Sequence, residues 1–425
     1  MKKLLIFILL LCSLPVNAQL TLDYCIERAD NNYPLLRKYG VVERTMALNL
    51  ADINKSWLPN VGLYAQGTAQ NVVPQFPEAL RGVLDQMGQN MQGLGKFQYK
   101  VGVDVSQTIW DGGQSKNQRE IARLQADVSE AELNVQLYAM HEKVINLFFG
   151  ILLIEEQIEQ TQNAISLLDA NRAKLMSMVK NGVALQSDVE MVSAQILTLQ
   201  QKIIEADNAV KGYKDVLGIF IDENVLDKQL IRPEMSLQTD DSSDRPELKL
   251  FESRMSLNNA LYKNIDTSLM PKVGFFAQAY YGYPGIDYFR AMMHRTPTFN
   301  LLAGVKISWN ISPLYTKDNS RKKIELQNMS TEIDRDIFLF NNNLQTTSQN
   351  NEIDGLKKVA AQDPEIISLR ENIRKVAESQ LSNGVIDMTG LLTKITDENQ
   401  AKLNASYHDI ELLYAVYKLK YILNR

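Results

Sequence analysis

Strictly alternating segments constrain the fold of this chain more than any other feature. Residues 97–109 and 299–311 each place apolar side chains at the odd positions, except for Gln107, and mainly polar residues or glycine at the even ones. This two-residue period is typical of a β-strand with one apolar and one polar face. Weaker alternation in residues 61–72 and 273–283 predicts a partner for each strand. We therefore expect two strand hairpins.

Aromatic residues gather near the predicted strand ends, among them Trp57, Tyr99, Trp110 and Trp309. Such girdles are typical of strands that cross an outer membrane, and each segment has the length that a tilted crossing requires. A soluble sheet with one solvated face is the alternative interpretation.

In a membrane barrel, the two faces of these strands would meet different surroundings. The apolar face would meet lipid, which predicts lipid contacts for Val101, Val103, Val305 and Ile307. The polar face would line a lumen and carries Lys100, Asp104 and Lys306.

A proline-free stretch between the strands predicts a very long helix. In residues 114–180 apolar residues recur at steps of three and four, the pattern of packed helices. At about 1.5 Å per residue, such a helix would extend about 100 Å. Residues 317–382 form a similar stretch, in which Pro364 should kink or restart the helix.

Both stretches end at the same motif, Asn181-Gly182-Val183 in one and Asn383-Gly384-Val385 in the other. Asn-Gly favours a helix stop because both residues accept the left-handed conformation. A further helix is predicted after each stop, at residues 185–217 and 389–423. The sequence thus predicts two long antiparallel helical hairpins.

The chain repeats its own pattern. Pro34 and Pro246 lie 212 positions apart, as do Pro59 and Pro271, and the two Asn-Gly turns lie 202 positions apart. Ordered matches at a nearly constant offset indicate an internal duplication. We expect a first repeat at 19–217, with strand hairpin 58–110 and helical hairpin 114–217, then a linker at 218–243. The second repeat is expected at 244–425, with strand hairpin 271–311 and helical hairpin 316–424.

The N-terminal segment predicts secretion. Two lysines precede an apolar run of about eleven residues, and Val16-Asn17-Ala18 forms a small-residue cleavage site. The run is too short to span a membrane as a helix, so residues 1–18 are expected to be a signal peptide. Cys25 would then be the one cysteine of the mature chain, and we expect it to pack as a small hydrophobic residue.

Composition argues against an enzyme and against a nucleic-acid-binding protein. The net charge is −5, and the basic residues are scattered rather than clustered. Three histidines without partner spacing offer no metal site, and carboxylate pairs such as Glu155-Glu156 fall in helical surface patterns. The sequence has no phosphate loop, nucleophile elbow or HExxH motif. We expect no catalytic, cofactor or metal site.

Four strands are too few to close a barrel, and closure is compulsory in lipid because an open edge leaves backbone groups without partners. Several chains must therefore pool strands. A twelve-strand barrel with an aqueous lumen corresponds to a trimer. The fold class expected is a mixed α/β membrane protein, with a β-barrel shared between chains and long coiled-coil helical hairpins.

The sequence resembles the TolC-like outer membrane efflux proteins over essentially the whole mature chain. The motifs that carry the resemblance are Leu20-Thr21-Leu22-Asp23, Asn32-x-Pro34, Leu58-Pro59, residues 107–113 (QTIWDGG), Asn181-Gly182-Val183 and Ser187-Asp188-Val189. The resemblance implies a homotrimer with a twelve-strand barrel in the outer membrane, a helical tunnel across the periplasm and a collar near the repeat junction. It also implies hairpin tips, at Asn181 to Val183 and Asn383 to Val385, that meet a periplasmic adaptor (membrane fusion) protein of an inner-membrane pump of RND or ABC type.

The implied function is a passive export duct of a tripartite efflux or type I secretion system, located in the cell outer membrane and extending into the periplasm. The alternative is a secreted coiled-coil structural or adhesion protein. One departure concerns the tunnel entrance, because Gly390 and Thr393 stand where the family often has acidic residues. Asp188 keeps the matching place in the first repeat, and Asp387 is expected to act as a substitute gating residue, with a solvated helix-cap residue as the alternative.

Overall fold

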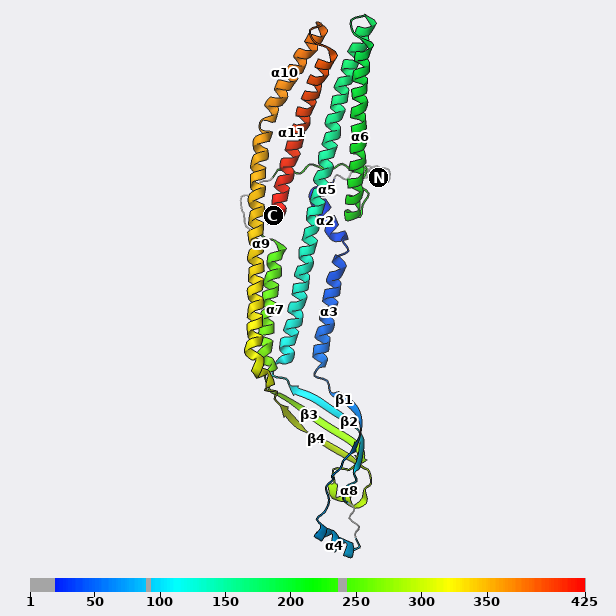
Figure 1. The fold of residues 1–425 in the computed structure, drawn as a ribbon, viewed down its shortest axis with the longest axis vertical. Coiled ribbons are helices and arrows are strands. Elements are labelled where there is room, and N and C mark those ends of the chain that lie inside the picture. Colours follow the sequence, from blue (N-terminus) through cyan, green and yellow to red (C-terminus); the bar gives the residue numbers. More distant parts are fainter. Residues whose placement is uncertain (1–19, 89–92, 236–242, 425) are drawn as a thin grey trace, which may run out of the picture. The chain divides into compact units, whose positions relative to one another are not determined.

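The computed structural model describes residues 20–88, 93–235 and 243–424, so the predicted signal peptide lies outside the described residues. Figure 1 shows long helices and one small sheet. In chain order the elements are α2 (Leu22–Asn32), α3 (Leu36–Lys55), β1 (Asn60–Ala69), α4 (Glu78–Gln86), β2 (Phe97–Trp110), α5 (Gln114–Lys180), α6 (Gln186–Ile221), α7 (Pro246–Ser268), β3 (Lys272–Tyr283), α8 (Tyr288–His294), β4 (Thr298–Ser308), the 3-10 turn η1 (Ser312–Thr316), α9 (Lys317–Ala360), α10 (Asp363–Ser382) and α11 (Met388–Leu423).

The chain divides into two compact units, each built from both halves of the sequence. The hairpin unit comprises the described residues within 1–40, 130–250 and 333–425, and the sheet unit comprises those within 41–129 and 251–332.

The sheet unit contains all four strands in antiparallel order β1-β2-β3-β4. The register places Gly62, Asp104, Gln278 and Leu302 in one row across the sheet. The two predicted strand hairpins are confirmed, and they join through β2 and β3. The observed strands β1 and β4 end at Ala69 and Ser308, a few residues before the ends expected from alternation.

A compact turn joins β2 to α5 in the sheet unit. Gly112 and Gly113 have φ of 71° and 86°, a region that favours glycine. The Asp111 carboxylate accepts hydrogen bonds from the Gly113 amide at 2.9 Å and the Ser115 amide at 2.7 Å. Burial would raise the pKa of Asp111, but these hydrogen bonds and that of the Ser115 hydroxyl lower it below the usual value.

The main core of the hairpin unit packs α2 against α5, α6 and α11, and it includes Cys25, Phe148, Phe149, Leu217 and Leu413. By length and composition α5 could span a membrane, but its apolar residues Phe148 and Phe149 lie in this core. Cys25 is fully buried, as expected, and burial raises the pKa of its thiol to about 12. The helix α6 continues to Ile221 rather than ending at residue 217, because Ile221 packs in the same core.

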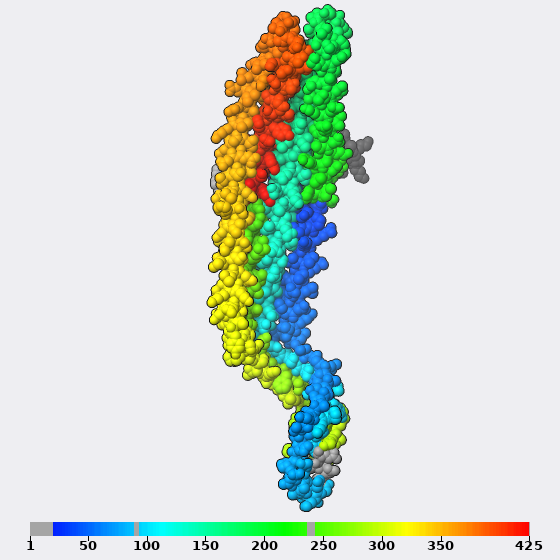
Figure 2. All heavy atoms as spheres, in the orientation of Figure 1, coloured from blue at the N-terminus to red at the C-terminus, as the bar shows by residue number. Residues whose placement is uncertain are grey.

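A second core, the turn-side core, joins the ends of the two helical hairpins α5/α6 and α10/α11. Its buried members are Ile165, Leu168, Leu175, Val189, Val192, Ile196, Ala377, Met388, Leu391 and Ile395. Figure 2 shows α11, in red and orange, lying between α10 and the green helices of the other hairpin. The helix break expected at Pro364 is confirmed, since α9 ends at Ala360 and α10 begins at Asp363.

Candidate functional surfaces

The sheet presents one apolar and one polar face, as the alternation predicts. The register aligns Val103 with Leu63 and Ala279, and Val305 with Phe275, which places these side chains on one face. Large apolar side chains of this face are exposed in the single chain, including Leu63 at 83%, Ile307 at 72%, Val305 at 66% and Val101 at 62%. An exposed apolar surface of this extent marks a contact with lipid or with another chain.

The opposite face carries the predicted polar residues. Lys100 pairs in register with Gln66 and Gly282, and Asp104 pairs with Gly62 and Gln278. Lys306 stands opposite Gly274 on the same face. The three charged residues therefore share a face but lie in different rows, so the structure does not gather them into one cluster.

The two predicted hairpin turns have the same geometry. Gly182 and Gly384 have φ of 73° and 70°. In the first turn the Val183 amide donates to the Met178 carbonyl at 2.9 Å, and in the second the Val385 amide donates to the Gln380 carbonyl at 2.8 Å. With the glycine amide bonds, these contacts form a Schellman stop at each helix end.

The turns are exposed, and Figure 2 shows each as a separate knob at the end of its hairpin. Val183 and Val385 are both 69% exposed, so each turn displays an apolar side chain to solvent. The structure thus places the six predicted tip residues on two similar surfaces within the hairpin unit.

The two predicted gating residues act as helix caps. Asp188 lies in the first turn of α6, and its carboxylate accepts a hydrogen bond from the Leu185 amide at 3.1 Å. Asp387 is the N-cap of α11 and accepts from the Gly390 amide at 2.8 Å. Acceptors at these positions satisfy free amides at the helix start.

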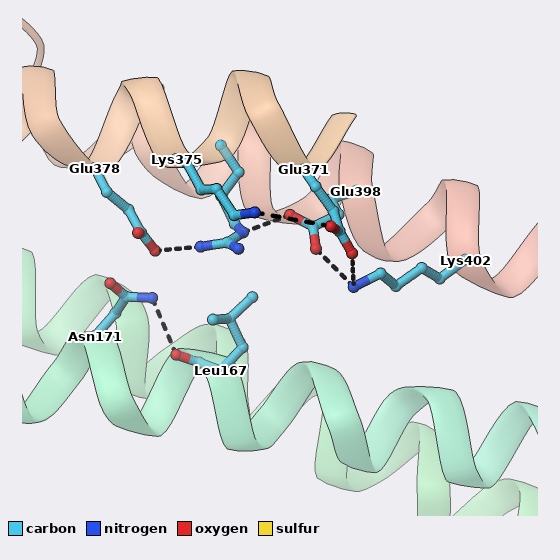
Figure 3. Close-up of polar contacts among 8 residues, drawn as sticks. Leu167, Asn171, Glu371, Lys375, Glu378, Glu398 and Lys402 are labelled. Atoms are coloured by element: carbon cyan, nitrogen blue, oxygen red, sulfur yellow. Dashed lines mark hydrogen bonds and ion pairs between the residues drawn. The ribbon is translucent and has the colours of Figure 1, made fainter. Parts of the chain in front are cut away.

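A buried ionic network near the second turn was not predicted. Glu398 of α11 is 1% exposed, and its carboxylate accepts from the Arg374 guanidinium of α10 and, at 2.7 Å, from the Lys402 ammonium. Arg374 also contacts Glu378 at 2.6 Å, and Lys402 contacts Glu371 at 3.1 Å. Figure 3 shows these charged groups meeting across the two helices, with Asn171 and Leu167 on the helix opposite.

The network changes the ionisation of its members. Burial would lower the pKa of Lys402, but hydrogen bonds to Glu398 and Glu371 raise it overall. The hydrogen bond from Lys402 lowers the pKa of Glu371. The sequence signal was the acidic Glu398 on the helix face that also carries Leu391 and Ile395, because an acid on a buried face requires a partner.

Two of the three histidines pair with carboxylates rather than with metal-ligand partners. His141 lies 2.8 Å from Asp30, and His408 lies 2.9 Å from Asp363. Among the residues that the structure describes, no group of three or more His, Cys, Asp or Glu side chains is placed to hold a metal ion.

Solved structures of outer membrane channels match this fold over nearly their whole length. The outer membrane protein VceC of Vibrio cholerae is 12% identical, with a TM-score of 0.66 and 95% of each chain covered. The outer-membrane channel OprN is 12% identical, with a TM-score of 0.67 and 95% of this chain and 89% of that chain covered.

The MtrE outer membrane channel of Neisseria gonorrhoeae, solved in its open state, is 14% identical, with a TM-score of 0.64 and coverage of 95% and 88%. No protein-family model and no curated protein matches the sequence. The structural similarity, spanning both the sheet and the helical hairpins, shows that this chain has the fold of outer membrane channel proteins.

Proposed function

We propose that this protein is the outer membrane channel of a tripartite efflux or type I secretion system, a passive duct that crosses the outer membrane and extends into the periplasm. The observation that carries the proposal is the four-stranded sheet in a chain with the fold of outer membrane channels. One face of this sheet exposes large apolar side chains, and the other face is polar. The helical hairpins supply the periplasmic part of the duct.

Closure of the barrel requires further copies of the chain. Within the described sheet, β1 and β4 each pair with one neighbour, so each has an unpaired edge. In lipid these edges must be satisfied, and pairing β4 of one chain with β1 of the next does so. Three chains give twelve strands, enough to enclose an aqueous lumen. We therefore propose a homotrimer.

Apolar stripes on the helices support contacts with a second copy. Ile333, Ile337, Phe340 and Leu344 follow the helical spacing on α9 and are 51% to 65% exposed. Ile366, Leu369, Ile373 and Val376 form a similar stripe on α10. Side chains spaced by three and four on one helix face pack against a neighbouring helix, and a second chain would bury them.

The orientation of the sheet follows from the same proposal. Val101, Val103, Val305 and Ile307 face lipid, and Lys100, Asp104 and Lys306 line the lumen. Arginine in place of Val103 should destabilise the folded protein in the membrane by about 2–4 kcal/mol if the position lies near the bilayer midplane. We expect Val103→Arg to reduce the amount of assembled protein in the outer membrane, whereas Asp104→Asn should leave assembly intact. Equal assembly of both variants would contradict this orientation.

The tip residues Asn181, Gly182 and Val183, with Asn383, Gly384 and Val385, are proposed to meet a periplasmic adaptor protein linked to an inner-membrane pump. The exposed valines offer apolar contacts, and the glycines allow close approach to the backbone. Asp188 and Asp387, at the first turns of the helices that follow, are proposed to place carboxylates near the tunnel entrance.

Membrane fractionation tests the proposal directly. The full-length protein should sediment with the outer membrane, resist extraction by high salt and dissolve only in detergent. A protein released without detergent would instead fit the secreted coiled-coil alternative and would overturn the proposed function.

A further inference from the structure

Lys100 occupies a distinct position on the polar face of the sheet. Its ammonium lies 5.6 Å from the ring centroid of Tyr64 and 5.7 Å from that of Tyr280. Both tyrosines stand opposite Gly102, so the two rings flank the lysine from the strands on either side. These contacts hold the cation in place through the negative faces of the rings.

Two glycines make room for this arrangement. A Cβ atom at Gly282 would lie 2.3 Å from the Tyr99 carbonyl oxygen and 2.7 Å from the Lys100 Cβ, and one at Gly102 would lie 2.5 Å from the Ala279 carbonyl oxygen and 2.7 Å from the Tyr280 Cβ. A larger residue at either position would therefore collide first with the backbone of the neighbouring strand. The glycines thus allow the close approach of the strands that carry Lys100 and Tyr280.

Among the described residues, no carboxylate forms an ion pair with Lys100. Asp104 is the nearest acid on the same face of β2, four residues along the strand, which corresponds to about 13 Å. Its carboxylate also approaches Gly62, where a Cβ would lie 3.0 Å from the Asp104 Oδ2. The charge of Lys100 is thus free to act on a solute.

Polar side chains line a hollow beside Lys100. Lys100 and Tyr280 line a hollow of about 220 Å³ together with Gln66, Thr68, Gln98 and Tyr288. Amide and hydroxyl groups donate hydrogen bonds to anions, and the volume suits chloride or a single carboxylate or phosphate group rather than a whole drug-sized molecule.

We propose that Lys100, flanked by Tyr64 and Tyr280, is an anion-binding site in the channel wall that makes the duct prefer anionic solutes. The inference rests on the proposed function, since a trimer would carry three such lysines around one lumen. Rings of lysine or arginine side chains select anions in other pores. The site adds a substrate preference to a duct whose selectivity is otherwise left to the pump.

Lys306 provides a matched control, because it carries the same charge on the same face. It stands opposite Gly274, is exposed, and contacts no aromatic ring among the described residues. Water therefore screens its charge more completely than that of Lys100.

The test is the reversal potential of purified, full-length channels in planar lipid bilayers under a KCl gradient. The wild type should prefer chloride, Lys100→Gln should lose that preference and Lys100→Glu should prefer potassium. Lys100→Arg should keep the chloride preference, and Lys306→Gln should shift the potential less than Lys100→Gln. Conducting channels whose reversal potential is unchanged in both Lys100→Gln and Lys100→Glu would overturn the inference, even though the proposed function would stand.

A second measurement covers the case in which these variants fail to assemble. In Lys100→Cys, a positively charged thiol reagent should restore the chloride preference and a negatively charged one should reverse it, because the native Cys25 is fully buried. Equal potentials after both reagents would also overturn the inference. A wild-type protein that forms no conducting channel would contradict the proposed function itself.

Discussion

The two helical hairpins share a turn but differ in what holds their helices together. Gly182 and Gly384 lie 202 positions apart and adopt the same left-handed conformation. At the same offset, Ile196 of α6 is 3% exposed within the turn-side core, whereas its counterpart Glu398 of α11 is 1% exposed within an ionic network. One hairpin is closed by apolar packing and the other partly by charge.

The difference extends to the facing helices. Arg172 of α5 pairs with Asp169 on its own helix and is 38% exposed, while Arg374 of α10 is 13% exposed and pairs across to α11. A glycine stop thus fixes the turn independently of the chemistry between the helices. A buried ion pair adds little net stability, but removing one partner is strongly destabilising because the other charge stays buried without compensation. We therefore expect single substitutions in the ionic network to destabilise α10/α11 more than substitutions at the matching positions destabilise α5/α6.

The largest expected effect is that of Glu398→Gln. The change leaves Arg374 buried without its main partner, although Glu378 stays close to it. We expect a loss of about 3 kcal/mol, at the lower end of the range for breaking a buried pair. Amide hydrogen exchange should show faster opening in α10/α11 than in α5/α6.

Two controls accompany that prediction. Arg172→Gln removes an exposed pair and should change the free energy of opening by less than about 0.5 kcal/mol. The double change Arg374→Leu with Glu398→Ile replaces the buried ion pair of the second hairpin by apolar side chains. It should restore most of the protection of the α10/α11 amides against hydrogen exchange. Unchanged exchange in Glu398→Gln would mean that the network does not stabilise this hairpin.

Alanine at either turn glycine should have a smaller effect, equal in both hairpins. No atom lies within 4 Å of the Cβ that would be added at Gly182 or Gly384, so the cost comes from the left-handed backbone alone. We expect each change to lower the free energy of opening of the last helical turn by about 1–2 kcal/mol, as measured by amide hydrogen exchange. Asparagine should be better tolerated. A clear inequality between Gly182→Ala and Gly384→Ala would show that the turns are not equivalent.

Much of the fold could be predicted from the sequence, because the alternation of apolar and polar residues and the Asn-Gly helix stops are local signals. Alternation located all four strands, and the absence of proline together with Asn-Gly located α5 and its end. The end of α6 was misplaced by four residues because Ile221 is held by packing with the main core, which a helical pattern does not reveal.

The site was predicted less completely. The turns and the polar face of the sheet follow from residue type and period, so the sequence predicts the helix stop at Gly384 and the place of Lys100 on the polar face. Arg374, one partner of Glu398, and the two tyrosines beside Lys100 lie on other elements, and only the packing of those elements brings them together. Asp188 and Asp387 were identified as charged residues near the turns, but their capping bonds depend on local backbone geometry.

Ile196→Val tests the contribution of apolar packing to the stability of the first hairpin, α5/α6. Removing one buried methyl group should cost about 1 kcal/mol in α5/α6. The loss should appear as faster exchange of the amides around Ile196, with the ionic contacts of Glu398 unaffected. A larger loss in α10/α11 than in α5/α6 would contradict the view that Ile196 stabilises mainly its own hairpin.

The smallest expected effect is a dependence of stability on pH that arises in the ionic network around Glu398. The folded pKa of Glu371 is lowered by its hydrogen bond with Lys402. Its contribution to stability is therefore complete above the ordinary pKa of 4.5 and is lost as the pH falls through the lowered pKa. Wild type and Glu371→Gln should therefore differ in urea midpoint at neutral pH and converge in acid. A difference that persists in acid would assign the effect to packing instead of charge.

Light scattering of the full-length protein, purified in detergent from the outer membrane, tests the central claim most directly. Because each chain contributes four strands, a closed barrel with an open lumen requires at least three chains, and the proposed homotrimer predicts a particle that contains three copies. A stable monomer with its sheet edges unpaired would contradict the account.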